Sequence, residues 1–75
     1  MEMGLERLHL GIGAAVTAVN TPSALKSRLE SFGMVPGTWI VPRYRSSDGT
    51  VTALEFRGTV IALRTRDLRN IRVAL

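Results

Sequence analysis

The side chains that could carry out chemistry in this chain are few. Among its 75 residues there is no cysteine, and His9 is the only histidine. A serine nucleophile would depend on that histidine near the start of the sequence, and no nucleophile-elbow pattern is present. A glycine-rich phosphate loop followed by lysine is also missing, which excludes a P-loop nucleotide hydrolase. We therefore expect that the protein is not an enzyme.

Three N-terminal residues have the spacing of a helical metal site. Glu2, Glu6 and His9 stand at i, i+4 and i+7 and would share one face of a helix. Glu6-x-x-His9 also has the spacing of di-iron helices, but that chemistry requires matching carboxylates on further long helices, which this chain lacks. We expect a solvated N-terminal segment. A transition metal ion held by Glu6 and His9 is the alternative, and no other cofactor is implied.

Positive charge is concentrated in the second half of the chain. The formal net charge is +4, and residues 38–75 hold seven arginines against three acidic residues. Such a stripe could bind phosphate groups, including those of nucleic acid. The four aromatic residues, however, provide little for base stacking. Arginines whose stems cover the apolar edges of a small domain are the alternative, so nucleic acid is the less favoured partner.

Trp39 is the residue most informative about a partner. If Ile40, Pro42 and Tyr44 face inward along a strand, then Trp39 faces outward with Val41, beside two arginines. An exposed tryptophan with neighbouring arginines is typical of an interaction hot spot. The alternative is that Trp39 covers the open end of a barrel or packs on the two apolar residues before the turn. The predicted partner-binding residues are Met34, Val35, Trp39, Val41, Arg43 and Arg45.

Length and composition favour one small folded domain over residues 1–75. The chain is 45% hydrophobic with a mean hydropathy of +0.15, which excludes a disordered segment. No apolar run approaches the roughly 20 residues of a membrane-spanning helix. The apolar stretch over residues 10–19 follows Glu2 and Glu6, which is not the positive segment of a secretion signal. We expect a strand there and a cytoplasmic protein.

One helix is predicted after the first strand, which covers residues 16–19. Thr21 has the position of an N-cap and Pro22 that of the first helical residue. Apolar residues follow with helical spacing, at Leu25, Leu29 and Phe32. Gly33 is placed to end the helix in a left-handed conformation.

Strand patterns then take over, with a period of two residues. Strands are predicted over residues 38–44, 50–57, 59–63 and 71–75, with a helical turn over residues 65–68 that Thr65 would cap. Asp48-Gly49 is typical of a hairpin turn, and Gly58 indicates a tighter reversal. About five short strands, one helix after the first strand and a short helical turn before the last predict a mainly β, small closed barrel. Closure would leave no edge strand exposed.

Four segments in the last two-thirds of the chain follow a known order. They are Arg28-Leu29, Phe32-Gly33-Met34-Val35-Pro36-Gly37, Gly58-Thr59-Val60-Ile61-Ala62-Leu63-Arg64 and Ile71-Arg72-Val73. In this order and spacing, residues 25–75 resemble the family of ferrous iron transport protein A, FeoA. Gly13 matches the family's early turn more loosely. The hairpin over residues 44–50 departs from the family's Arg-x-Ala-Pro-x-Gly-x-Pro pattern.

The resemblance implies a cytoplasmic SH3-like β-barrel that supports FeoB, the membrane ferrous-iron transporter with a cytosolic GTPase domain. The protein would be a non-enzymatic accessory protein that docks on this cytosolic portion and meets the membrane only through the transporter. FeoA-like domains also end the iron-dependent repressors of the DtxR type, so a metal-responsive domain is a further alternative. Those repressors need a DNA-binding domain for which 75 residues leave no room, and we expect a free-standing protein.

Overall fold

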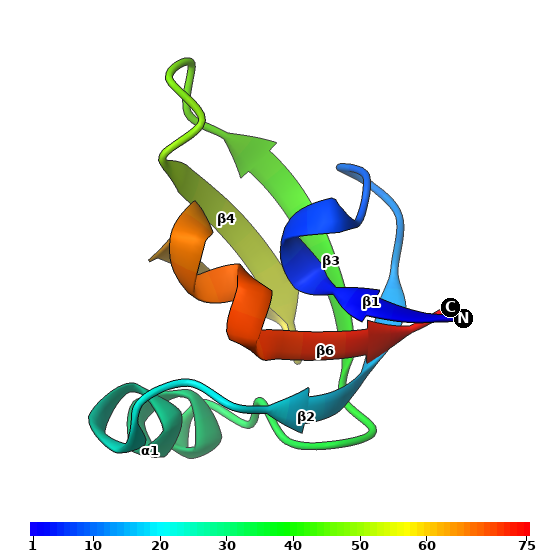
Figure 1. Cartoon of the computed structure of the whole chain (residues 1–75), viewed down its shortest axis with the longest axis vertical. Coiled ribbons are helices and arrows are strands. Elements are labelled where there is room, and N and C mark those ends of the chain that lie inside the picture. Colours follow the sequence, from blue (N-terminus) through cyan, green and yellow to red (C-terminus); the bar gives the residue numbers. More distant parts are fainter.

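The computed structural model describes all residues, 1–75, and contains six strands, one α-helix and two short 3-10 helices (Figure 1). The elements in chain order are β1 (Glu2–Gly4), η1 (Leu5–Arg7), β2 (Ala14–Val19), α1 (Ser23–Ser31), β3 (Trp39–Arg45), β4 (Val51–Phe56), β5 (Thr59–Arg64), η2 (Thr65–Asn70) and β6 (Ile71–Ala74). The mainly β architecture with one helix after the first long strand is as predicted. The sixth strand, β1, was not predicted.

All strand pairs are antiparallel, in the order β1-β6-β2-β3-β4-β5. The sheet curls on itself, and the two ends of the chain lie side by side (Figure 1). No ladder joins β1 to β5, so both remain edge strands. The open side is instead covered by η2, which contacts β1, β5 and η1. The expectation that closure removes every edge was therefore wrong, because the two 3-10 helices close the barrel without a strand pair.

The N-terminal segment is part of the fold, contrary to the predicted solvated segment. Glu2 of β1 pairs with Ala74 of β6, and Leu5 and Leu8 are both buried in the hydrophobic core. These two leucines stand three residues apart, the spacing that aligns side chains on a 3-10 helix. η1 therefore brings both leucines to the core with a single turn, and the first residues of the chain are held by the last strand.

The helix ends as predicted but begins differently. Gly33 has a φ of +96°, its N–H donates to the Glu30 carbonyl, and the Met34 N–H donates to the Leu29 carbonyl. This bonding pattern is a Schellman motif. At the other end Pro22 is the N-cap, and the buried Thr21 hydroxyl makes no capping bond.

None of the helices has the length and the apolar character that crossing a membrane would require.

A register shift in β3 changes which residues face the core. Ile40 and Pro42 are buried, as predicted, but Tyr44 is 71% exposed. The pairing of β3 with β4 shifts between Pro42 and Tyr44, so one additional residue on β3 reverses the alternation. The prediction that Tyr44 faces inward was therefore wrong. In β4 the alternation is regular, and its inward residues Thr52 and Leu54 are buried as predicted.

The helical turn after β5 is longer than predicted and has no side-chain cap. η2 spans Thr65–Asn70, and its N-cap is Arg64 rather than Thr65. The Thr65 hydroxyl instead lies 2.9 Å from the hydroxyl of Thr52 on β4. This bond ties the start of η2 to the sheet at the point where the chain leaves β5.

Candidate functional site

Trp39 is the first residue of β3, and it is 61% exposed, as predicted. It pairs across the sheet with Ala15 of β2. A Cβ atom added to Gly13 would collide with the indole, whose Nε1 would be the nearest atom. Gly13 thus leaves the space that the indole occupies against the backbone before β2. Trp39 is an exposed aromatic side chain that is nevertheless supported by the sheet.

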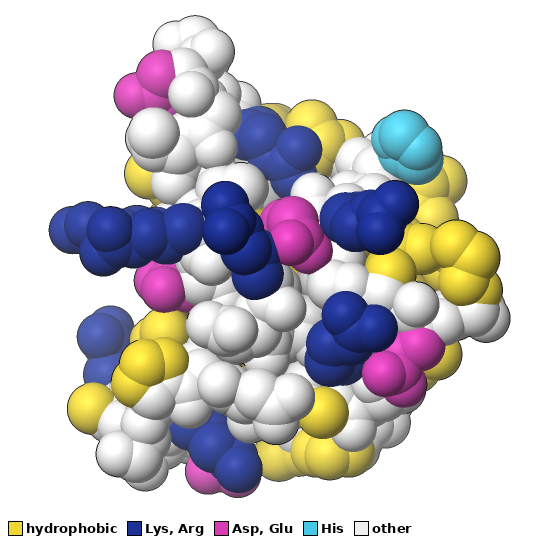
Figure 2. Space-filling model, viewed as in Figure 1, with side chains coloured by type: hydrophobic (Ala, Val, Ile, Leu, Met, Phe, Trp, Pro, Cys, Tyr) yellow, Lys and Arg dark blue, Asp and Glu magenta, His cyan; other side chains and the backbone are white.

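Two more exposed apolar residues precede Gly13 on the loop between η1 and β2. They are Leu10 and Ile12. The Gly11 N–H donates to the Pro42 carbonyl over 2.7 Å, which fastens this loop to β3. Figure 2 shows hydrophobic side chains beside the histidine, which is His9. We call Leu10, Ile12 and Trp39 the Trp39 surface.

The two predicted arginines of β3 lie toward its other end and already have partners. At about 3.3 Å of rise per residue, Arg43 and Arg45 stand about 13 Å and about 20 Å along the strand from Trp39. The Nε of Arg43 donates to Glu55 Oε1 on β4 over 2.5 Å. The Nε of Arg45 donates to the Thr52 hydroxyl over 3.1 Å. The structure therefore does not bring these arginines to the indole.

The remaining predicted partner-binding residues differ in their access to solvent. Met34 was expected on a docking surface, but it is fully buried in the core. It follows Gly33, which ends the helix, and its side chain packs inward. Val35 and Val41 are half-buried. Their role in binding stays a prediction.

The predicted metal residues do not assemble into a site. Glu2 lies in β1 and Glu6 in η1, so these residues and His9 share no helical face. Glu2 receives a bond of 3.4 Å from Arg72 Nε on the neighbouring strand. The structure contains no group of three histidine or acidic side chains that could hold a metal ion. Glu6 and His9 therefore belong to no such group.

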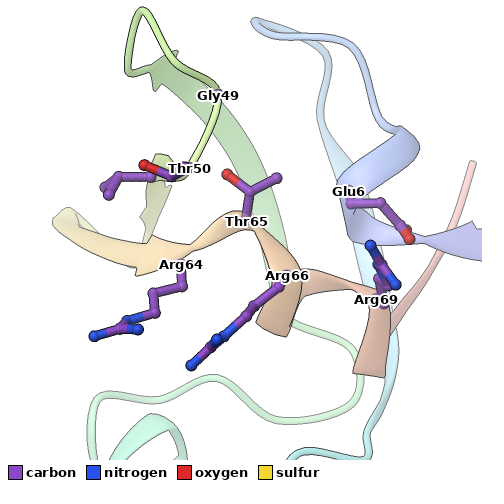
Figure 3. Close-up of a pocket in the computed structure, with 8 residues that line it drawn as sticks. Glu6, Gly49, Thr50, Arg64, Thr65, Arg66 and Arg69 are labelled. Carbon is purple, nitrogen blue, oxygen red and sulfur yellow. The ribbon is translucent and has the colours of Figure 1, made fainter.

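A cavity of about 570 Å³ lies between the β3–β4 hairpin, the end of β5, and η1 and η2 (Figure 3). Its lining residues are Glu6, Gly49, Thr50, Val51, Arg64, Thr65, Arg66 and Arg69. The charge pattern predicted a stripe of arginines but no cavity. Three segments that are far apart in the sequence build it, and the sequence contains no signal that they come together. We call it the arginine pocket.

A curled antiparallel sheet of six strands with one peripheral helix defines a small, mainly β barrel. Residues 3–75 match the model of the FeoA domain. The chain therefore belongs to the FeoA family, as the order of its motifs predicted.

Solved structures show the same fold. FeoA from Chlorobium tepidum has a TM-score of 0.91 at 27% identity, and the match covers 95% of this chain and 68% of that one. FeoA from Stenotrophomonas maltophilia, in complex with zinc, has a TM-score of 0.84 at 25% identity, covering 96% of this chain and 89% of that one. The latter is a prokaryotic SH3 domain protein, which confirms the predicted SH3-like fold.

The fold is also shared with transcriptional regulators. A manganese-dependent transcriptional repressor has a TM-score of 0.83 at 12% identity, and the match covers 96% of this chain but 40% of the repressor. At this identity the likeness shows the fold alone. Among curated protein sequences none matches the chain.

Proposed function

We propose that this protein is a non-enzymatic, cytoplasmic accessory protein of ferrous iron uptake that docks on the cytosolic portion of the transporter FeoB. Membership of the FeoA family supports this function. It is further supported by the S. maltophilia relative, for which a role as a bacterial ferrous iron transport activating factor has been proposed. The structural observation that carries the proposal is that Trp39 is exposed while its indole lies against Gly13.

The Trp39 surface has the physical properties of a docking site. Tryptophan is among the residues that most often dominate binding free energy, and truncation of such a residue costs about 2 kcal/mol or more. The indole already lies against Gly13, so less side-chain freedom is lost when a partner covers it. Leu10 and Ile12 add apolar area on a loop that a backbone hydrogen bond fastens to β3.

The partner is tested by titration of the whole chain with the purified cytosolic portion of FeoB. We expect binding that Trp39→Ala weakens by about 30-fold, which corresponds to about 2 kcal/mol. Tyr44→Ala is the matched control, because Tyr44 is an exposed aromatic residue on the same strand, beyond the register shift. It should leave the affinity within about twofold.

Two results would count against the proposal in different ways. If the wild-type chain does not bind the cytosolic portion, the proposed function is wrong. If it binds but Trp39→Ala and Tyr44→Ala have the same small effect, docking takes place elsewhere and only the Trp39 surface is wrong.

A further inference from the structure

The arginine pocket contains three arginines whose side chains make no hydrogen bond or ion pair inside the protein. Arg64 ends β5, and Arg66 and Arg69 belong to η2. None of the three forms an ion pair or donates a side-chain hydrogen bond. Side-chain hydrogen bonds are donated instead by four other arginines, Arg43, Arg45, Arg57 and Arg72, of which Arg43 and Arg72 also form ion pairs. Each of these guanidinium groups has five N–H donors, so the pocket is lined by donors that have no acceptor within the protein.

The charge of the lining is strongly unbalanced. The lining holds three arginines and one carboxylate, that of Glu6, which gives a formal charge of +2. Figure 3 shows Arg64 and Arg66 extending in the same direction, away from Arg69 and Glu6, which point toward one another. Figure 2 shows basic side chains in a band across this face with one acidic side chain among them. The buried Glu6 Oε1 has no hydrogen-bond donor, so no bond fixes Glu6 to an arginine.

The hairpin side of the pocket is held in place by hydrogen bonds. The Thr65 N–H donates to the Thr50 carbonyl over 2.8 Å, and the Thr65 hydroxyl contacts that of Thr52. The Thr50 N–H and hydroxyl both donate to Asp48 Oδ1, over 3.1 and 2.8 Å. These bonds engage the Asp48 carboxylate in the hairpin and fix the position of Thr50. One wall of the pocket is therefore preformed, while its arginines stay available.

We propose that the arginine pocket binds a small polyanion that carries at least two linked phosphate groups. Guanidinium groups recognise phosphate oxygens in pairs, and three of them exceed what one phosphate group needs. The volume of 570 Å³ lies within the range of small-molecule sites, about 300–1,000 Å³. Val51 is the only hydrophobic lining residue, so the pocket offers no aromatic side chain for stacking a base. Recognition is thus directed to the phosphates and not to a nucleoside.

The chemistry is shared by inorganic pyrophosphate, tripolyphosphate and nucleoside di- and triphosphates. Calorimetric titration of the full chain with each of them, at low and at high salt, separates these sources. We expect tripolyphosphate and a nucleoside triphosphate to bind with affinities within about threefold of each other, because the lining offers the base no aromatic stacking partner. Orthophosphate should bind at least about tenfold more weakly, and high salt should weaken all of them.

Substitutions test the site itself. Arg66→Ala and Arg69→Ala should each weaken pyrophosphate binding about tenfold, since each removes a charge-assisted contact. Arg28→Ala is the matched control: Arg28 is an exposed arginine on α1 without an ion pair, and its removal changes the net charge equally. Glu6→Gln should strengthen binding severalfold, because it removes the one opposing charge. A circular dichroism melt of each variant verifies that it is folded.

Clear outcomes would overturn the proposal. One is a flat titration with pyrophosphate at low salt. A second is an equal loss in Arg28→Ala and Arg66→Ala, which would show attraction to net charge only. A third is an oligonucleotide that binds more tightly than tripolyphosphate and is not displaced by it, which would identify nucleic acid as the ligand. None of these measurements involves FeoB, so they are independent of the proposed function.

Discussion

The indole of Trp39 occupies the space that a side chain on Gly13 would fill. Trp39 begins β3 and Gly13 directly precedes β2, and Trp39 pairs with Ala15, two residues after Gly13. Gly13 does not have a positive φ, so its backbone would tolerate other residues. The missing side chain at position 13 therefore serves the placement of the indole and not the conformation of the chain.

Gly13→Ala should separate binding from stability. The added methyl group must displace the indole, which is exposed and can move to another rotamer, so we expect unfolding free energy to change by about 1 kcal/mol or less. Docking on the cytosolic portion of FeoB should weaken about tenfold, because the indole is no longer held in its bound position. Urea unfolding and titration of the same sample measure both quantities. Unchanged affinity would show that the indole does not need this support.

Leu5→Ala should show that the N-terminal segment is part of the core. Leu5 is completely buried, and truncation of a buried leucine costs about 2–5 kcal/mol. Leu10→Ala is the control, because Leu10 lies on the exposed loop and its loss should cost about 0.5 kcal/mol or less. Urea unfolding curves of the two variants measure the difference. Equal midpoints would contradict the placement of Leu5 in the core.

Asp48 should titrate at an unusually low pH. Hydrogen bonds from the Ser46 hydroxyl and from the Thr50 N–H and hydroxyl lower the pKa of this carboxyl from 3.8 to about 2. Because the folded pKa is the lower one, the stabilisation is complete above about pH 4 and is lost as the pH falls through about 2. An NMR titration of the Asp48 carboxyl carbon measures the midpoint. Ser46→Ala should move it toward 3.8, and an unmoved midpoint would show that the Ser46 bond is not the main cause.

Local patterns in the sequence predicted most of the fold. The end of α1 at Gly33 and the inward residues of β4, such as Leu54, follow from interactions between residues close in the chain. β1 was missed because it is three residues long and pairs with a strand some seventy positions away, as in Glu2 with Ala74. Tyr44 was misplaced because the register shift in β3 depends on its pairing with β4.

The candidate sites were less predictable than the fold. The exposure of Trp39 follows from strand alternation, but its contact with Gly13 requires the β2–β3 register. The arginine pocket joins residues as distant as Glu6 and Arg69, and only the tertiary structure brings them together. Charge counting identified the arginines and could not distinguish the paired Arg43 from the unpaired ones.

The turn between β4 and β5 combines a conformational cost with a compensating bond. Arg57 and Gly58 have φ values of +52° and +75°, and they link the paired residues Phe56 and Thr59. Two residues with positive φ indicate a type I′ turn, in which Asn-Gly is preferred and arginine is disfavoured. The Arg57 Nε donates to the Gly33 carbonyl over 3.1 Å and so connects the turn to the end of α1.

Two substitutions at position 57 should separate these contributions. Arg57→Ala loses the bond to Gly33 and keeps an unfavourable residue at positive φ, so we expect a loss of about 1 kcal/mol. Arg57→Asn loses the same bond but provides the residue that the turn prefers, and it should be more stable than Arg57→Ala by about 0.5–1 kcal/mol. Urea unfolding gives both values. If the two variants were equally stable, the turn would store no conformational strain, and the bond to Gly33 would account for the whole role of Arg57.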